Sequence, residues 1–274
     1  MPSDYEAIRR ENAVRYGTDI GRIGPMLLAD RYDDRTHFIF ELLQNAEDAL
    51  AKRTAWNGPR SVRFHLSHSK IRVSHFGKQF DEPDVRGICG IAESTKDLTE
   101  IGRFGIGFKS VYAFTDRPEV HSGVEDFAIE SFVWPVPSPP TLRNAEETLI
   151  IAPLRDPTDR EEISTGLQRL GPGSLLFLRE IEEIEWEVED GPSGLYLRSP
   201  AENLGDTFRR VSLIGESKGR PVFEQTWLIS AKPVLWDGNV AGRVEAAFLL
   251  DPQTNNTRIL TLSRSPLVVF FRQF

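Results

Sequence analysis

A glycine-rich stretch is the sequence feature that most restricts how this chain can fold. Gly102, Gly105 and Gly107 stand in the segment GRFGIGFKS, which leads into an expected helix at residues 108–114. Glycines at such a position let backbone N–H groups approach a phosphate at the positive end of a helix. The segment is not G-x-x-x-x-G-K-[ST], and no clear strand precedes it as a dinucleotide fingerprint requires. Because G-x-x-G-x-G also occurs in structural turns, the stretch alone leaves a phosphate site and a plain turn both open.

A second feature is the helix predicted between Asp34 and Lys52. Apolar residues recur in it at helical spacing, and four polar residues form one stripe beside the apolar face. The stripe consists of Glu41, Asn45, Asp48 and Lys52. One interpretation is a solvated edge with i, i+4 contacts. The other is a ligand wall, because an Asn carbonyl can bind Mg²⁺ and a Glu one turn earlier can orient and deprotonate water.

The remaining patterns predict an α+β fold with a sheet covered on one face. Further helices are expected at residues 4–16, 81–89 and 161–170. Strands are expected at residues 62–66, 71–73, 119–121, 126–133 and 148–152, with a proline-rich turn at 135–140. Beyond a boundary near residues 171–173, strands are expected at residues 175–178, 183–188, 195–197, 208–213, 223–229 and 244–249.

Composition restricts the class of protein. The 274 residues suffice for one large domain or two ordinary ones. Lys and Arg total 33 against 41 Asp and Glu, a net charge of −8, and no window is dense in basic residues, so binding nucleic acid by phosphate neutralisation is disfavoured. The longest apolar runs fall far short of the roughly 20 residues that span a bilayer. The single cysteine, Cys89, is expected to be a core thiol, and a cytoplasmic setting without a membrane partner is expected.

Taken together, the helix segment ELLQNAEDA at residues 41–49 and the glycine-rich segment resemble two sequence boxes of the GHKL ATPase superfamily. This superfamily includes gyrase, heat-shock chaperones, histidine kinases and MutL. The sequence IGRFGIGFKSVY at residues 101–112 is most similar to that of the sacsin-type branch, and the resemblance is specific over residues 34–123. It implies a Bergerat-type two-layer α/β sandwich with a mixed sheet over residues 1–172. A β-rich extension over residues 173–274 is expected to continue into domains absent from this chain.

The resemblance also implies roles for individual residues. Glu41 corresponds to the general base for the attacking water, and Asn45 corresponds to the Mg²⁺ ligand. The other residues expected at ATP are Asp48, Ala49 and Lys52 on the helix, Gly77, the lid residues Ser94, Thr95 and Lys96, the phosphate cradle Gly102, Phe104, Gly105, Ile106, Gly107 and Lys109, Phe108 near the adenine, and Thr148.

One position departs from the family pattern. The family reads the adenine amino group with an Asp in D-x-G-x-G, whereas this chain has HFGKQ, with His75 at the Asp position and Gln79 in place of the second glycine. Neutral imidazole has one acceptor nitrogen, so we expect His75 to accept from the adenine amine and to lose this bond on protonation near pH 6.5. The alternatives are base recognition through backbone and water, or a pocket that has lost ATP.

The function implied by the resemblance is Mg²⁺-dependent hydrolysis of ATP to ADP and phosphate. The chain is then a conformational switch in a chaperone-like or defence-associated protein, with a protein client and a nucleotide-dependent dimer as its partners. The alternative is a nucleotide-sensing or pseudo-ATPase interaction module, and a further one is a pocket for another nucleotide. Glu41 favours the enzyme, whereas His75 and Gln79 favour the binding module.

Overall fold

The computed structural model of the chain describes residues 1–21, 24, 34–91, 107–217, 219, 221–236 and 238–260. Its α-helices are α1 (Tyr5–Tyr16), α3 (Phe38–Ala51), α4 (Glu82–Cys89) and α5 (Asp159–Arg169). Short 3₁₀ helices are η1 (Arg35–His37), η2 (Gly107–Ala113), η3 (Pro172–Leu175) and η4 (Pro252–Thr254). The strands are β1 (Ser61–Leu66), β2 (Lys70–His75), β3 (Glu119–Ser122), β4 (Glu125–Glu130), β5 (Trp134–Pro137), β6 (Thr148–Pro153), β7 (Glu183–Val188), β8 (Ser193–Arg198), β9 (Glu202–Asn203), β10 (Phe208–Ser217), β11 (Phe223–Trp236) and β12 (Asn239–Leu249).

The described strands join into one mixed sheet. Its order is β12-β11-β10-β8-β7-β1-β2-β6-β3-β4-β5, and β9 pairs with β10. Strands β1 and β7 run parallel, with Val62 beside Ile184, and the other described pairs are antiparallel. The predicted α+β class with a mixed sheet is therefore confirmed. The sheet passes without a break through the place where a boundary near residue 172 was expected, and that boundary stays a prediction.

Burial alternates along the central strands, so one face of the sheet is covered. In β1 the side chains of Val62, Phe64 and Leu66 are buried, whereas Arg63 is exposed. Burying such an apolar side chain contributes roughly 1.5 to 3 kcal/mol. The covering layer is formed by α3 and α5, whose apolar residues belong to the same core.

Helices α3 and α5 approach each other closely because Gly166 has no side chain. A Cβ at Gly166 would lie 2.7 Å from the Thr36 side chain and 2.9 Å from that of Ile39. The 3₁₀ helix η1, which leads directly into α3, begins with a cap, because the Asp34 carboxylate accepts hydrogen bonds from the Thr36 amide at 2.8 Å and from the Thr36 hydroxyl at 2.6 Å. The start of the predicted helix is therefore held by both a cap and a close contact with α5.

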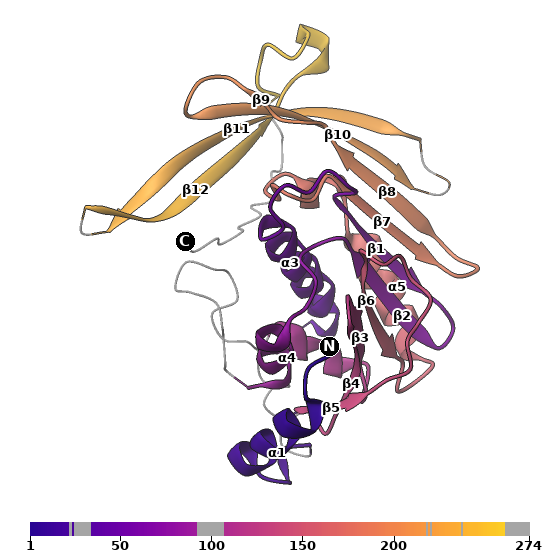
Figure 1. Cartoon of the computed structure of the whole chain (residues 1–274). Coiled ribbons are helices and arrows are strands. Elements are labelled where there is room, and N and C mark those ends of the chain that lie inside the picture. Colours follow the sequence, from indigo (N-terminus) through magenta and orange to yellow (C-terminus); the bar gives the residue numbers. More distant parts are fainter. Residues whose placement is uncertain are drawn as a thin grey trace.

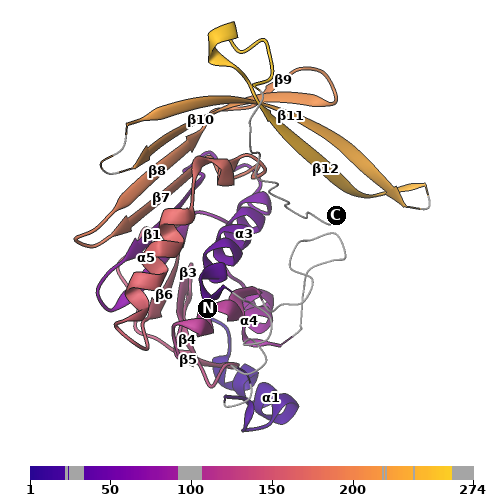
Figure 2. The ribbon, with the colours of Figure 1, turned by 180° about the vertical axis from the view of Figure 1, so that it is seen from behind.

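Figures 1 and 2 show the overall arrangement from opposite sides. Helix α1 lies at one end of the molecule, strands β10 to β12 lie at the other, and α3 lies between them beside the central strands. Within the described ranges, no helix has the length and apolar character needed to cross a membrane.

Three local predictions differ from the structure. The expected turn at residues 135–140 begins instead as β5, an edge strand that pairs with β4, where proline is tolerated because one side of the strand needs no donors. The expected strand at 175–178 is the end of η3 and the bends after it. A short apolar run cannot separate a strand from buried irregular backbone. The expected helix at 108–114 is the 3₁₀ helix η2.

Candidate functional site

Helix α3 presents the predicted polar stripe along the edge of its buried face. Glu41, Asn45, Asp48 and Ala49 are half-buried, and Lys52, just past the end of the helix, is exposed. This arrangement follows from the amphipathic sequence, since the turns that bury Leu42 and Ala46 leave the stripe at the margin of the core. The stripe is therefore neither fully solvated nor sealed, as a ligand wall requires.

The Glu41 carboxylate is held in a defined position. Its side chain is 17% exposed, and Nε2 of His37, one turn earlier, lies 3.1 Å from its Oε1. Sequence reasoning missed His37, although its i, i+4 spacing from Glu41 was a usable signal.

Gly107, the last glycine of the glycine-rich stretch, lies directly against Glu41. A Cβ placed on Gly107 would collide with Oε2 of the Glu41 carboxylate and lie 3.2 Å from its Cδ. The two features singled out in the sequence therefore meet in space at this point. The backbone at the start of η2 and the Glu41 carboxylate therefore border the same space.

The end of β2 docks on the C-terminal half of α3. The Lys78 amide donates to the Ala49 carbonyl at 2.8 Å, and a Cβ on Gly77 would lie 2.8 Å from the Ala49 carbonyl carbon. Only a residue without a side chain allows this approach. Ala49 and Gly77, both predicted site residues, are thus in contact.

His75 is the last residue of β2, and its side chain faces the covered side of the sheet. It is 4% exposed, and the Gly77 amide donates a hydrogen bond to its Nδ1 at 3.1 Å. A backbone N–H can only donate, so Nδ1 is the acceptor and the proton of the neutral ring lies on Nε2. The acceptor nitrogen is thus engaged within the protein, whereas the sequence led us to expect it to accept from the adenine amine.

The charge state of His75 also differs from the expectation. Burial, followed by the positive charge of Arg53, lowers the pKa of His75 to about 4. Arg53 is fixed nearby, because its guanidinium donates to the carbonyls of Phe76 at 2.7 Å and Gly77 at 3.3 Å. Protonation near pH 6.5, expected for unperturbed imidazole, therefore does not apply to the folded chain.

Three polar side chains form a row across the sheet beside the docking point. His75 pairs in register with Thr148 of β6, which pairs with Ser122 of β3. The Ser122 and Thr148 hydroxyls are hydrogen-bonded at 2.6 Å, and both residues are fully buried. Thr148 was predicted as a site residue, whereas Ser122 was not. Ser122 can be placed beside Thr148 only once the order of the strands is known.

Lys109 and Phe108 point into the core. Lys109 is 1% exposed, its ammonium donates to the Phe132 carbonyl, and burial lowers its pKa to about 8. Its ammonium is thus bonded inside the protein, and the expected contact of Lys109 with the nucleotide stays a prediction. Phe108 is buried in the core cluster. The expected core thiol Cys89 is buried too, and burial raises its pKa to about 12.

Part of the predicted site falls outside the residues that the structure describes. These are the lid residues Ser94, Thr95 and Lys96 and the cradle residues Gly102, Phe104, Gly105 and Ile106. Their expected roles stay predictions.

Glu47, which the sequence reasoning did not single out, has a structural role within the same helix segment. Its buried carboxylate accepts backbone hydrogen bonds from Arg179 at 2.6 Å, Glu180 at 3.1 Å and Ile181 at 3.0 Å. Charge-assisted bonds of this kind fix the segment that leads into β7. The helix that carries Glu41 is therefore tied directly to the second half of the chain.

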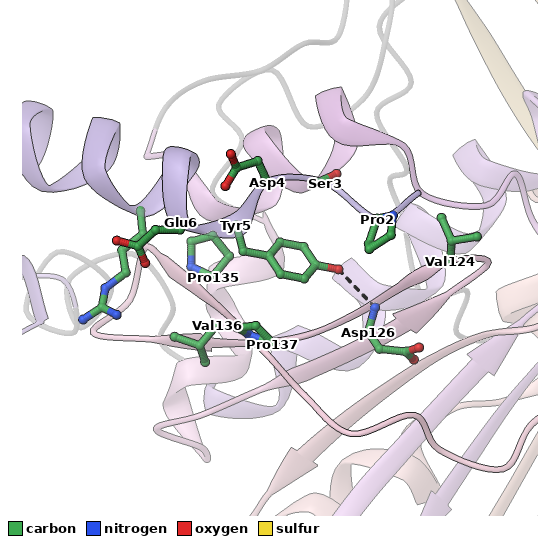
Figure 3. A pocket seen from close by; sticks show the side chains of 11 residues that line it. Pro2, Ser3, Asp4, Tyr5, Glu6, Val124, Asp126, Pro135, Val136 and Pro137 are labelled. Carbon is green, nitrogen blue, oxygen red and sulfur yellow. Dashed lines mark hydrogen bonds between the residues drawn. The ribbon is translucent and has the colours of Figure 1, made fainter.

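Two pockets lie away from this site. One, of about 500 Å³, lies between the N-terminal segment and β4 and β5. Figure 3 shows Tyr5 extending along it to the backbone of Asp126, whose amide donates to the Tyr5 hydroxyl at 3.1 Å. The other, of about 730 Å³, is lined by Arg63, Ser74 and Glu185 on the uncovered face of the sheet, among others. None of the residues lining these two pockets belongs to the predicted site.

Comparisons with known proteins found a family that matches part of the chain and relatives that match between 39% and 92% of it. Residues 73–130 match the family described as the Sacsin domain. Protein NO VEIN of Arabidopsis thaliana is 26% identical over 283 residues, which cover 92% of this chain and 10% of that protein. Sacsin of Homo sapiens is 36% identical over 145 residues, covering 45% of this chain and 3% of sacsin. Chaperone protein HtpG of Sulfurovum sp. is 27% identical over 134 residues, covering 39% of this chain and 22% of that protein.

These matches confirm the resemblance to the sacsin-type branch of the GHKL superfamily. The chain spans only a small part of each of these relatives, from 3% to 22% of their length.

Proposed function

We propose that this chain is the nucleotide-binding module of a larger chaperone-like protein, with a Bergerat-type fold that binds ATP with Mg²⁺ and hydrolyses it to ADP and phosphate. The contact between Glu41 and Gly107 carries this proposal. It sets a carboxylate beside the end of the glycine-rich stretch, where phosphates are expected. A positioned carboxylate next to a phosphate site is the arrangement that general base catalysis of hydrolysis needs.

The surroundings of Glu41 support its proposed role as the general base. Nε2 of His37 lies 3.1 Å from one carboxylate oxygen, Oε1, while Oε2 faces Gly107. An interaction at one oxygen fixes the orientation of the carboxylate, and the other oxygen is then directed at the phosphate end of the site. In this role Glu41 accepts the proton of the attacking water.

Asn45 suits the metal role because its carboxamide lies one turn beyond Glu41 on the same half-buried edge. Within the described part of the chain, no group of three or more His, Cys, Asp and Glu side chains is placed to hold a metal ion. The proposed Mg²⁺ would be held by Asn45 together with phosphate and water oxygens, as is usual for this ion. When bound, it neutralises phosphate charge.

The length of α3 fits an extended ligand. Glu41 and Ala49 are separated by about 12 Å along the axis, at about 1.5 Å per residue. The phosphates are proposed at the Glu41 end and the base at the Ala49 end, where Gly77, His75 and Thr148 lie. Asp48 and Lys52 are proposed to line the same wall.

The partners and the setting are proposed from the comparisons. One relative is named a chaperone, and this chain covers a small share of each relative. We propose a protein client, a nucleotide-dependent dimer and a cytoplasmic location. Residues 1–172 are proposed to form the nucleotide-binding domain, and residues 173–274 its β-rich extension.

A second candidate function is a nucleotide-sensing or pseudo-ATPase module without turnover. The burial of Lys109 favours it, since this cation is bonded to Phe132 and is not offered to phosphates. The engagement of His75 Nδ1 by the Gly77 amide favours it as well.

The experiment that separates the two functions compares the chain with Glu41→Gln. ATP affinity is measured by calorimetric titration with Mg²⁺, and phosphate release is measured at steady state. We expect Glu41→Gln to retain affinity and to lose turnover by about 10² to 10⁴. Glu161→Gln on the exposed face of α5 is the matched control.

Each result has a distinct meaning. Turnover in Glu41→Gln at the unmodified rate removes Glu41 from the mechanism. ATP binding without phosphate release in the unmodified chain supports the sensing module. Absence of nucleotide binding overturns both functions.

A further inference from the structure

His75 is fixed as a hydrogen-bond donor by the fold. The Gly77 amide donates to Nδ1 at 3.1 Å, and the tight packing of Gly77 against Ala49 holds that amide in place. The Lys78 amide bond to the Ala49 carbonyl at 2.8 Å, and the Arg53 guanidinium bonds to the Phe76 and Gly77 carbonyls, restrain the same short segment. The neutral ring therefore carries its proton on Nε2.

Because Nδ1 of His75 is bonded to the Gly77 amide, Nε2 is the ring nitrogen with which His75 can bind a ligand. Among the residues that the structure describes, no polar group hydrogen-bonds Nε2 of His75. Nε2 of His75 is not one of the side-chain nitrogens that are buried without a partner, so it retains some exposure through which a ligand acceptor can bind. Its neighbours in the row, Thr148 and Ser122, are bonded to each other.

The position of His75 relative to α3 gives the chemistry of the acceptor. His75 lies beside Ala49 and Gly77, at the end of the wall where the nucleobase is proposed, about 12 Å along the helix axis from Glu41. Adenine presents a donor, the 6-amino group, and an adjacent ring acceptor, N1. A donor on the protein is matched by N1 and opposed by the amino group.

We propose that His75 selects adenine by donating its Nε2–H to the ring nitrogen N1, and not by accepting from the 6-amino group. The inference rests on the proposed function, because it assigns the base end of the same site. Burial supports it by keeping the ring neutral over the physiological range, so that the donor and acceptor roles stay fixed. His75 is then a specificity-determining residue.

Three analogues of ATP separate the two modes of recognition. In 1-deaza-ATP the N1 acceptor is replaced by C–H, and in purine riboside triphosphate the amino group is removed while N1 is kept. In ITP, N1 carries a hydrogen and is a donor. If His75 donates to N1, 1-deaza-ATP and ITP bind about tenfold more weakly than ATP, and purine riboside triphosphate binds about as well as ATP.

The test is a calorimetric titration of the full chain with each nucleotide and Mg²⁺, repeated with His75→Ala. We expect the difference between ATP and 1-deaza-ATP to disappear in His75→Ala. Equal affinity for ATP and 1-deaza-ATP in the unmodified chain, or a large loss with purine riboside triphosphate, overturns the inference while the proposed function stands. Tighter binding of ITP than of ATP also overturns it. Binding of none of these nucleotides overturns the proposed function and this inference together.

A second measurement does not depend on the stability of the variant. The ¹⁵N chemical shifts of the histidine rings in the unmodified chain report which nitrogen carries the proton. We expect the His75 ring to be the Nε2–H tautomer at pH 7, with its Nε2 resonance shifting when ATP is added and not when 1-deaza-ATP is added. An Nδ1–H tautomer overturns the inference.

Discussion

The carboxylate of Glu41 lies so close to the backbone of Gly107 that a single added carbon at Gly107 would collide with it. The contact joins the first turn of the amphipathic helix α3 to the end of the glycine-rich segment. It means that any side chain at position 107 would displace the Glu41 carboxylate, even though the backbone there does not adopt the left-handed conformation.

The first prediction concerns Gly107→Ala. The added Cβ displaces the Glu41 carboxylate without straining the backbone, so ATP turnover falls while the fold is kept. Displacement of a catalytic group by about 1 Å can lower the rate about 10²-fold. Steady-state phosphate release measures the effect, and a thermal unfolding curve checks the fold. Gly173→Ala is the control, because a Cβ at Gly173 meets nothing within 4 Å. Unchanged turnover in Gly107→Ala contradicts the proposed position of the base.

The second prediction concerns the metal. Asn45→Ala removes the proposed oxygen ligand, so the gain in ATP affinity on adding Mg²⁺ is lost, whereas Asn45→Asp keeps an oxygen at the same place and retains that gain. Titrations of both variants with and without Mg²⁺ measure it. The assignment of Asn45 fails if Asn45→Ala binds ATP with the same Mg²⁺ dependence as the unmodified chain.

The third prediction concerns Glu47. Glu47→Ala leaves the amides of Arg179, Glu180 and Ile181 without their acceptor, and the free energy of unfolding falls by about 3 kcal/mol. Glu47→Gln keeps one acceptor oxygen and loses less. Urea unfolding measures both, with the exposed Glu161→Ala as a control that stays within about 0.5 kcal/mol. A loss in Glu47→Ala no larger than that of the control shows that this segment is held by other contacts.

Local patterns were sufficient for part of the fold. The apolar spacing of α3 and the Asp34 cap predicted a helix that the structure contains, and alternation predicted β1, with Val62 and Leu66 buried. Strand β5 was missed because its prolines are compatible with a strand only at a sheet edge. Edge position depends on strand order, which a single sequence does not specify.

The candidate site was predicted as a set of residues but not as a set of contacts. The glycine-rich stretch and the Glu41 stripe were identified from local chemistry, and their meeting at Gly107 depends on long-range packing. The hydrogen bond from the Gly77 amide to His75 could not be predicted, because it depends on the turn that directs this amide at the ring. The internal bond of Lys109 could not be predicted for a similar reason, since its partner Phe132 is distant in sequence.

The fourth prediction concerns pH and His75. The folded pKa of about 4 lies below the ordinary value near 6.5, so below pH 6.5 the unfolded chain binds a proton that the folded chain does not. The contribution of His75 to stability is therefore fully present above pH 6.5 and is lost as the pH falls from 6.5 to 4. At about 1.36 kcal/mol per pKa unit, the loss reaches about 3 kcal/mol by pH 4.

Urea unfolding between pH 8 and pH 4 measures this loss as a difference between the unmodified chain and His75→Gln, because the other titrating groups are common to both. We expect the free energy of unfolding of His75→Gln to fall less steeply through this window. His65→Gln, on the uncovered side of β1, is the matched control and should follow the unmodified chain. Parallel pH profiles for the unmodified chain and His75→Gln would mean that the ring takes up its proton in the folded state as readily as in the unfolded state. The low pKa of His75 in the folded chain would then be excluded.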